Sequence, residues 1–129
     1  MDKHLDEKLC EEYPKIFRQR NMSMKVTCMC WGFDCDNGWY WLIDNLCHQL
    51  QWDIDHNKYP QLEAVQVKEK FGTLRFYVYG GNAEQNAIIS FAESLSGSIC
   101  ERCGSTEEVT QTSGWIQSLC KKCIGDKHV

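Results

Sequence analysis

The sequence predicts a small α+β domain, and three patterns indicate this fold class. Residues 39–50 repeat apolar side chains with a helical period, residues 62–79 alternate them as strands do, and Cys-x2-Cys pairs lie at 100–103 and 120–123. The 129 residues fit one domain. We expect two helices, a β-hairpin, a third helix and a C-terminal four-cysteine zinc ribbon or treble-clef-like knuckle. Residues 1–97 would form the helical and hairpin core, with residues 98–129 as a zinc-bound tail packed on it.

The first expected helix covers residues 3–19 and is interrupted at Pro14, whose ring clashes with the preceding turn. Its apolar side would hold Leu5, Leu9, Tyr13, Ile16 and Phe17. Residues 20–37 show no regular period, and we expect an irregular segment there.

The second helix has the clearest pattern. Asp36 or Asn37 is suited to cap it by accepting from free amides of the first turn. Six residues then follow at i, i+3, i+4, i+7, i+8 and i+11 and predict one buried stripe: Trp39, Leu42, Ile43, Leu46, Cys47 and Leu50. Trp41 and Trp52 belong to a second line beside this stripe.

The predicted hairpin pairs residues 62–69 with 73–79, and Gly72 supplies the positive φ angle of a tight turn. A third helix then starts at Asn82, where Gln85 completes a capping box, and it ends at Gly97. We expect its buried face to consist of Ala87, Ile88, Phe91, Ala92 and Leu95.

Four cysteines, Cys100, Cys103, Cys120 and Cys123, have the spacing of one structural zinc site. Each two-residue gap lets a tight turn direct both sulfurs at one ion. Four thiolates close the coordination shell, so the ion would stabilise the fold and perform no chemistry. The tail has few large apolar residues, and chelation should therefore unfold it first.

Composition and charge disfavour several classes of function. The chain is 43% hydrophobic and has a net charge of −4, which disfavours gripping duplex DNA by its phosphates. No apolar run reaches the roughly 20 residues of a membrane span, and the polar start MDKHLDEKLC does not resemble a signal peptide. With nine cysteines, an odd number, we expect a reduced cytoplasmic protein that does not engage a membrane.

Two groups of residues are candidates for binding. The hairpin concentrates basic and aromatic side chains that are suited to stack on a nucleotide or bases: Lys68, Lys70, Arg75, Tyr77 and Tyr79. Alternatively, they form an ordinary exposed sheet face with charges that protect its edge. Trp41 and Trp52 would anchor a protein partner if exposed, or would widen the core contact if buried.

Catalytic and further metal motifs are weak. The sequence has no His-Glu-x-x-His, no Gly-rich phosphate loop and no Gly-x-Ser-x-Gly, so we expect a protein that is not an enzyme. A second metal site from Cys28, Cys30 and Cys35, with Cys10, Cys47 and His48, stays open, although none of these cysteines forms a Cys-x2-Cys pair. Free cysteines are commonly small buried hydrophobes.

Three segments have distinctive sequences: GWYWLID at 38–44, QVKEKFGTLRFY at 66–77, and CERCG at 100–104 with Gly114-Trp115-Ile116 before Cys120. Together they resemble a group of small phage and prophage zinc-binding proteins of mostly unassigned function. The resemblance spans residues 28–123 and implies an accessory protein in the cytoplasm of a bacterial host. It implies no catalytic residue.

These patterns lead to three functional hypotheses. The first is a non-enzymatic phage accessory protein that binds a host protein or protein complex and inhibits a defence or regulatory system. The second is a nucleic-acid or nucleotide binder that uses the hairpin face. A zinc-stapled nuclease comes third.

Overall fold

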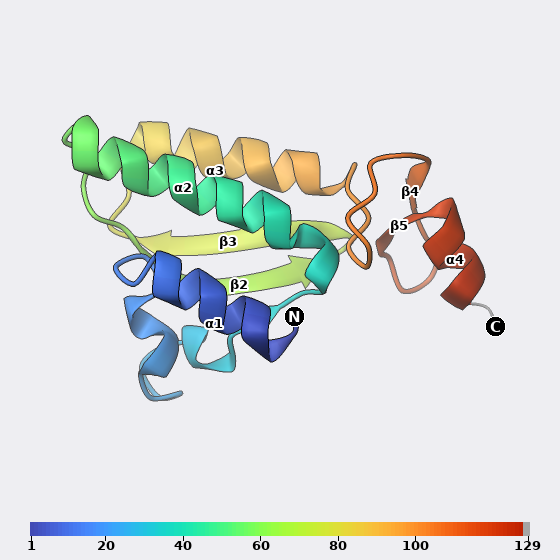
Figure 1. Ribbon diagram of the computed structural model, residues 1–129, viewed down its shortest axis with the longest axis horizontal. Helices are drawn as coiled ribbons and strands as arrows, with labels where there is room; N and C mark the ends of the chain where they lie inside the picture. The colour runs from blue at the N-terminus through green and yellow to red at the C-terminus, as the bar shows by residue number, and fades with distance from the viewer. Residues whose placement is uncertain (128–129) are drawn as a thin grey trace.

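The computed structural model describes residues 1–127, with side chains described as far as residue 125. A three-stranded sheet in the order β1-β2-β3 carries helices on one side, and a two-stranded sheet with a last helix follows (Figure 1). The element bounds are α1 (Lys3–Glu12), β1 (Phe33–Asp34), α2 (Tyr40–His56), β2 (Glu63–Lys70), β3 (Thr73–Tyr79), α3 (Ala83–Ser96), β4 (Val109–Gln111), β5 (Ser118–Cys120) and α4 (Lys121–Lys127), with 3-10 turns at Arg18–Asn21, Met29–Trp31 and Asn37–Trp39. The fold class α+β is confirmed.

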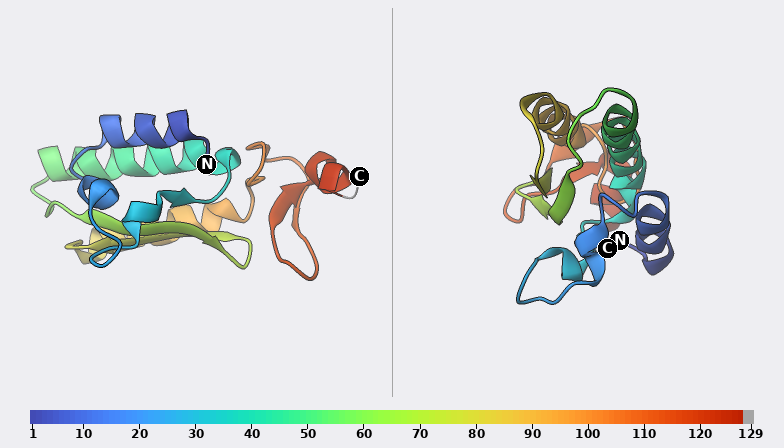
Figure 2. Two further views of the ribbon diagram at one scale, coloured as in Figure 1. Left: turned by 90° about the horizontal axis from the view of Figure 1, so that it is seen from below. Right: turned by 90° about the vertical axis from the view of Figure 1, so that its left-hand side faces the viewer.

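Helices α2 and α3 run antiparallel to one another along the sheet, and α1 lies beside α2 (Figures 1 and 2). The β4, β5 and α4 elements project beyond one end of this body, which makes the molecule elongated. None of the helices within residues 1–127 is both long and apolar enough to cross a membrane.

Helix α1 ends at Glu12, so the predicted interruption at Pro14 is confirmed. The chain does not resume an α-helix over residues 15–19, as the sequence suggested, but continues in turns and a 3-10 turn. Tyr13 anchors the end of α1 to the second helix, because its hydroxyl donates to Asp44 Oδ1 at 2.7 Å.

Helix α2 confirms the predicted buried stripe but not the predicted cap, because its N-cap is Trp39, without a side-chain hydrogen bond, and Asp36 caps the 3-10 turn before it. Asp36 accepts from the backbone N–H of Asn37, one 3-10 turn follows, and the α-helix starts at Tyr40. All six residues of the predicted stripe are buried. The indole of Trp39 also donates to the carbonyl O of Ile99 at 3.0 Å, which links the start of the helix to the segment before the cysteines.

The hairpin is also confirmed, with Lys70 opposite Thr73 and Phe71-Gly72 as its two-residue loop. Both loop residues have positive φ, 54° and 87°, as a type I′ turn requires. The short strand β1, which lies parallel to β2, was not predicted. Its two residues, Phe33 and Asp34, are too few to show a strand period within the irregular segment.

Helix α3 has the predicted capping box between Asn82 and Gln85, but its predicted buried face is wrong in part. Ala87, Phe91 and Leu95 are exposed and Ile88 is half-buried, whereas the buried residues are Gln85, Ile89, Ala92 and Ser96. The polar side of α3 faces inward because the helix lies along the open edge of β3. Glu93 Oε2 accepts from the N–H of Phe76 and Ser96 Oγ from that of Leu74, both at 2.8 Å.

The C-terminal unit, residues 100–127, contacts the body at two glycines. The N–H of Gly38 donates to the carbonyl O of Glu101 at 2.7 Å, and a Cβ on Gly38 would overlap the carbonyls of Cys100 and Glu101. Ser118 Oγ donates to the carbonyl O of Gly72 at 2.6 Å. These contacts join the C-terminal unit to the start of α2 and to the hairpin turn.

Candidate metal centre and binding surfaces

The four predicted cysteines converge. The Sγ atoms of Cys100, Cys103, Cys120 and Cys123 all lie within 4.8 Å of one another, and those of Cys103 and Cys120 are 3.7 Å apart. A tetrahedral zinc ion with Zn–S bonds of about 2.3 Å needs sulfurs about 3.8 Å apart. The geometry therefore fits a single metal ion held by four sulfurs.

Local backbone structure positions each pair of sulfurs. The first pair lies in a tight turn in which the N–H of Gly104 donates to the carbonyl O of Cys100 at 2.8 Å, and Gly104 takes a φ of +84°. In the second pair, Cys120 ends β5 and Cys123 lies in the first turn of α4. A strand end and a helix start thus provide two ligands from one short segment.

The protein already favours one thiolate in this cluster. Burial opposes ionisation of Cys100, but the backbone N–H groups of Cys120, Cys103 and Arg102 stabilise the thiolate and lower its pKa to about 7. Burial and the neighbouring sulfurs instead raise the pKa of Cys123. Metal binding must therefore displace protons from the cluster, and acid should weaken it.

The remaining cysteines do not form a second site of this kind. Over the described residues, Cys100, Cys103, Cys120 and Cys123 are the only group of three or more His, Cys, Asp or Glu placed to share a metal. Cys35 and Cys47 are buried, and Cys28 is exposed. Burial and the Asp6 carboxylate raise the pKa of Cys10 to about 12.

The hairpin residues share one face but not one pocket. Lys68 lies opposite Arg75 in the register, and Tyr77 and Tyr79 alternate with the core residues of β3. Lys68 and Lys70 line a cavity of about 670 Å³ beside the C-terminal unit. A shallower hollow of about 850 Å³ is lined by Tyr77 and Tyr79, together with the loop that holds exposed Met24 and Val26.

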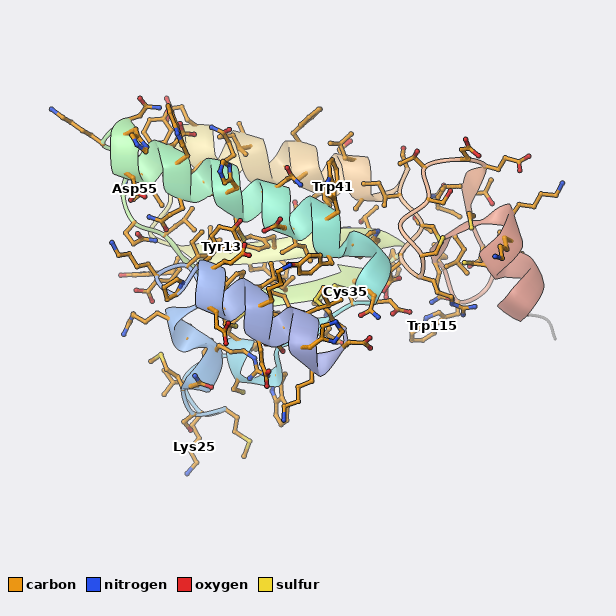
Figure 3. All side chains as sticks on the ribbon, viewed as in Figure 1. Tyr13, Lys25, Cys35, Trp41, Asp55 and Trp115 are labelled. Carbon is orange, nitrogen blue, oxygen red and sulfur yellow. The ribbon has the colours of Figure 1, made fainter. Side chains whose placement is uncertain are left out.

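Both candidate tryptophans are exposed, Trp41 by 67% and Trp52 by 45%. Trp52 stacks on His56 with ring centroids 4.5 Å apart. Figure 3 places Trp41 toward one end of α2 and Asp55 at the other, so these indoles do not form one patch. Trp31 and Trp115, which are not among the predicted binding residues, are exposed to a similar degree.

Glu101 is the site residue that the sequence did not reveal. It lines the 670 Å³ cavity, is only 6% exposed, and its Oε2 accepts from the N–H of Asp36 at 3.0 Å. Its Oε1 is buried and has no hydrogen-bond partner among the residues described. Burial raises the pKa of Glu101. No local sequence pattern marks this glutamate, because the burial of its Oε1 depends on contacts between distant parts of the chain.

Comparison of the chain with protein-family models, curated proteins and solved structures gives no match. What the metal centre and the cavities do is therefore inferred from their own residues.

Proposed function

We propose that the four-cysteine centre binds one structural zinc ion in a treble-clef-like unit. A tight turn, the β4–β5 hairpin and the start of α4 follow one another in the order of that motif, and four thiolates are the ligand set that zinc prefers in structural sites. In this proposal zinc fixes the shape of residues 100–127, and other parts of the surface bind the partner.

We further propose that the chain is a non-enzymatic binding protein whose partner is another protein. The observation that carries this proposal is the exposure of four of its five tryptophans, since tryptophan is strongly enriched at the energetic centres of interfaces. Among the residues whose side chains are described, twelve large apolar side chains are exposed: Met24, Val26, Trp31, Trp41, Trp52, Phe71, Tyr77, Tyr79, Phe91, Leu95, Trp115 and Ile116. The resemblance to phage proteins favours a bacterial host protein, and inhibition of a defence or regulatory system, as the role.

A pull-down tests this function. Metal-loaded protein on beads is incubated with bacterial lysate, and retained proteins are identified by mass spectrometry. We expect one host protein at near-stoichiometric yield, and a loss of about tenfold or more in affinity for at least one of Trp31→Ala, Trp41→Ala and Trp115→Ala. The exposed Lys15→Ala serves as the control. Absence of any protein above the bead background would contradict the proposal.

The outer face of the hairpin supports a second candidate, a nucleic-acid or nucleotide binder. Lys68 and Arg75 are neighbours across the strands, and Tyr77 lies next along β3 on the same face. A basic pair beside an exposed ring is a suitable platform for a stacked base. Fluorescence anisotropy with a labelled single-stranded oligonucleotide tests this: Arg75→Ala should abolish binding and Lys15→Ala should not. No binding by the wild-type protein would dismiss this candidate.

A further inference from the structure

The 670 Å³ cavity lies where the body and the C-terminal unit meet. One wall comes from the hairpin tip, residues 68–71, and from residues 34–36 next to β1, and the opposite wall from residues 114–117 between β4 and β5. Figure 3 shows Trp115 on the flank of the C-terminal unit that faces Cys35. The cavity therefore exists only while both parts are folded and joined.

Glu101 is held rigidly in this cavity. Its N–H donates to the carbonyl O of Ser118 at 2.9 Å and its own carbonyl O accepts from Gly38. One carboxylate oxygen accepts from the N–H of Asp36, which leaves Oε1 buried without a partner among residues 1–127. A buried carboxylate oxygen without a donor is costly. A ligand that brings a donor to this oxygen would remove that cost.

The walls carry two exposed aromatic rings. Phe71 at the hairpin tip is 68% exposed, and Trp115 in the β4–β5 loop is 76% exposed. Both rings line the same cavity as Glu101. The faces of aromatic rings attract cations, and Lys70 Nζ already lies 5.7 Å from the Phe71 ring centroid.

The charge of the cavity favours a cation over a phosphate. Its lining includes four carboxylates, those of Asp34, Asp36, Glu69 and Glu101, against the two ammonium groups of Lys68 and Lys70. The ammonium group of Met1 adds a third positive charge and donates to the carbonyl O of Cys35 at 2.6 Å, so four negative and three positive groups leave a net charge of −1. This net negative charge repels a phosphate and attracts a cation.

We propose that this cavity binds a basic side chain, an arginine guanidinium or a lysine ammonium, of the partner protein. Glu101 Oε1 accepts a hydrogen bond from the cation, while Trp115 and Phe71 flank its aliphatic stem and charge. The inference rests on the proposed function as a protein-binding module and identifies the chemistry that the module recognises.

Titration of the full-length, metal-loaded protein with small probes tests the proposal. Nα-acetyl-L-arginine amide and Nα-acetyl-L-lysine amide are added while the indole N–H resonance of Trp115 is followed by NMR. Nα-acetyl-L-citrulline amide serves as the uncharged analogue of the arginine probe, and guanosine monophosphate represents a nucleotide. We expect saturable movement of the Trp115 resonance with at least one cationic probe and none with citrulline. Equal responses to arginine and citrulline, or a response to the nucleotide alone, would overturn the proposal.

Two variants separate recognition from folding. Glu101→Gln keeps the shape of the side chain and should weaken binding of the cationic probe about tenfold or more. Trp115→Ala changes an exposed loop residue and should weaken it about two- to fivefold, as followed on the amide of Phe71. Lys15→Ala, which changes an exposed residue outside the cavity, should leave the affinity unchanged. Wild-type affinity in both cavity variants would refute the proposal.

The outcome is independent of the test for the proposed function. If the wild-type protein retains a host protein from lysate while neither cationic probe moves Trp115, the cavity inference is wrong and the protein-binding function stands. If a cationic probe binds with the expected variant effects, the cavity inference is supported whatever the lysate contains.

Discussion

The body and the C-terminal unit are held together in different ways. The body buries one continuous apolar cluster that draws on α1, α2, the sheet and α3, with Trp39, Leu50 and Leu74 fully enclosed. Among its described residues, Leu119 is the only apolar side chain that the C-terminal unit buries apart from three of its four cysteines, and Val109 and Ile124 are half-buried around them. Burial of apolar surface can therefore account for the body, whereas the small core of the C-terminal unit supports our proposal that a metal ion stabilises it.

Both regions carry exposed large apolar side chains. Ten of the twelve belong to the body, and Trp115 and Ile116 belong to the C-terminal unit. In our proposal, the fold of the C-terminal unit depends in addition on the ion. The cavity beside Glu101 has one wall from each region, so its shape depends on the folding of both.

Removing a metal ligand should give the largest effect. Cys120→Ser takes one sulfur from the cluster and should lower bound metal well below one ion per chain. Residues 100–127 should lose their structure, because structural zinc contributes on the order of 10 kcal/mol in small domains. Elemental analysis and amide NMR measure the two quantities. Cys28→Ser, an exposed cysteine outside the cluster, should retain full metal content.

Separating the two regions should have the next largest effect. In Gly38→Ala the new Cβ overlaps the carbonyls of Cys100 and Glu101, so the C-terminal unit must move away from α2. We expect a loss of about 3 kcal/mol or more in the free energy of unfolding, from denaturant titration. Gly125→Ala is the control, since nothing lies within 4 Å of its Cβ position. Equal stability of the two variants would show that the junction is loose.

A cavity in the body should destabilise the body alone. Leu50 is fully buried in α2, and Leu50→Ala should cost about 2–5 kcal/mol in unfolding free energy. The metal content should stay at one ion per chain, because Leu50 lies outside the cysteine cluster. Leu95→Ala on the exposed side of α3 should cost much less. Loss of metal in the Leu50 variant would mean that the regions are not distinct.

The smallest effect concerns a surface ion pair of the body. Hydrogen bonds from Arg18 and Gln19 lower the pKa of Glu63 from its usual 4.5. The pair therefore stabilises the fold at pH values above 4.5, and this contribution disappears as the pH falls through the lowered pKa. Glu63→Gln should lower the melting temperature slightly at pH 7 and not at all near pH 2. An equal loss at both pH values would contradict this account.

The sequence predicted those features that depend on one element or one spacing. The stripe of α2, the Asn82 capping box and the Phe71-Gly72 turn all depend on neighbours in the chain, and the structure confirms them. The cysteine spacing likewise identified the four cysteines whose sulfurs the structure brings together.

Features that depend on tertiary contacts could not be predicted from the sequence. Phe91 and Leu95 were placed in the core, but the N–H groups of β3 require the polar side of α3, and those two residues therefore face outward. The isolated carboxylate oxygen of Glu101 arises only where residues 34–36, the hairpin tip and the cysteine turn meet. No local sequence pattern predicts that these three segments come into contact.

The division between the two regions is tested most directly by chelation. Amide NMR spectra of the metal-loaded protein are recorded before and after a strong zinc chelator is added at neutral pH under reducing conditions. We expect the resonances of residues 100–125 to collapse into the unfolded range, together with that of the Trp115 indole, while those of Ile43, Leu50 and Leu74 keep their dispersion. A spectrum that does not change, or one that collapses throughout, would contradict this account.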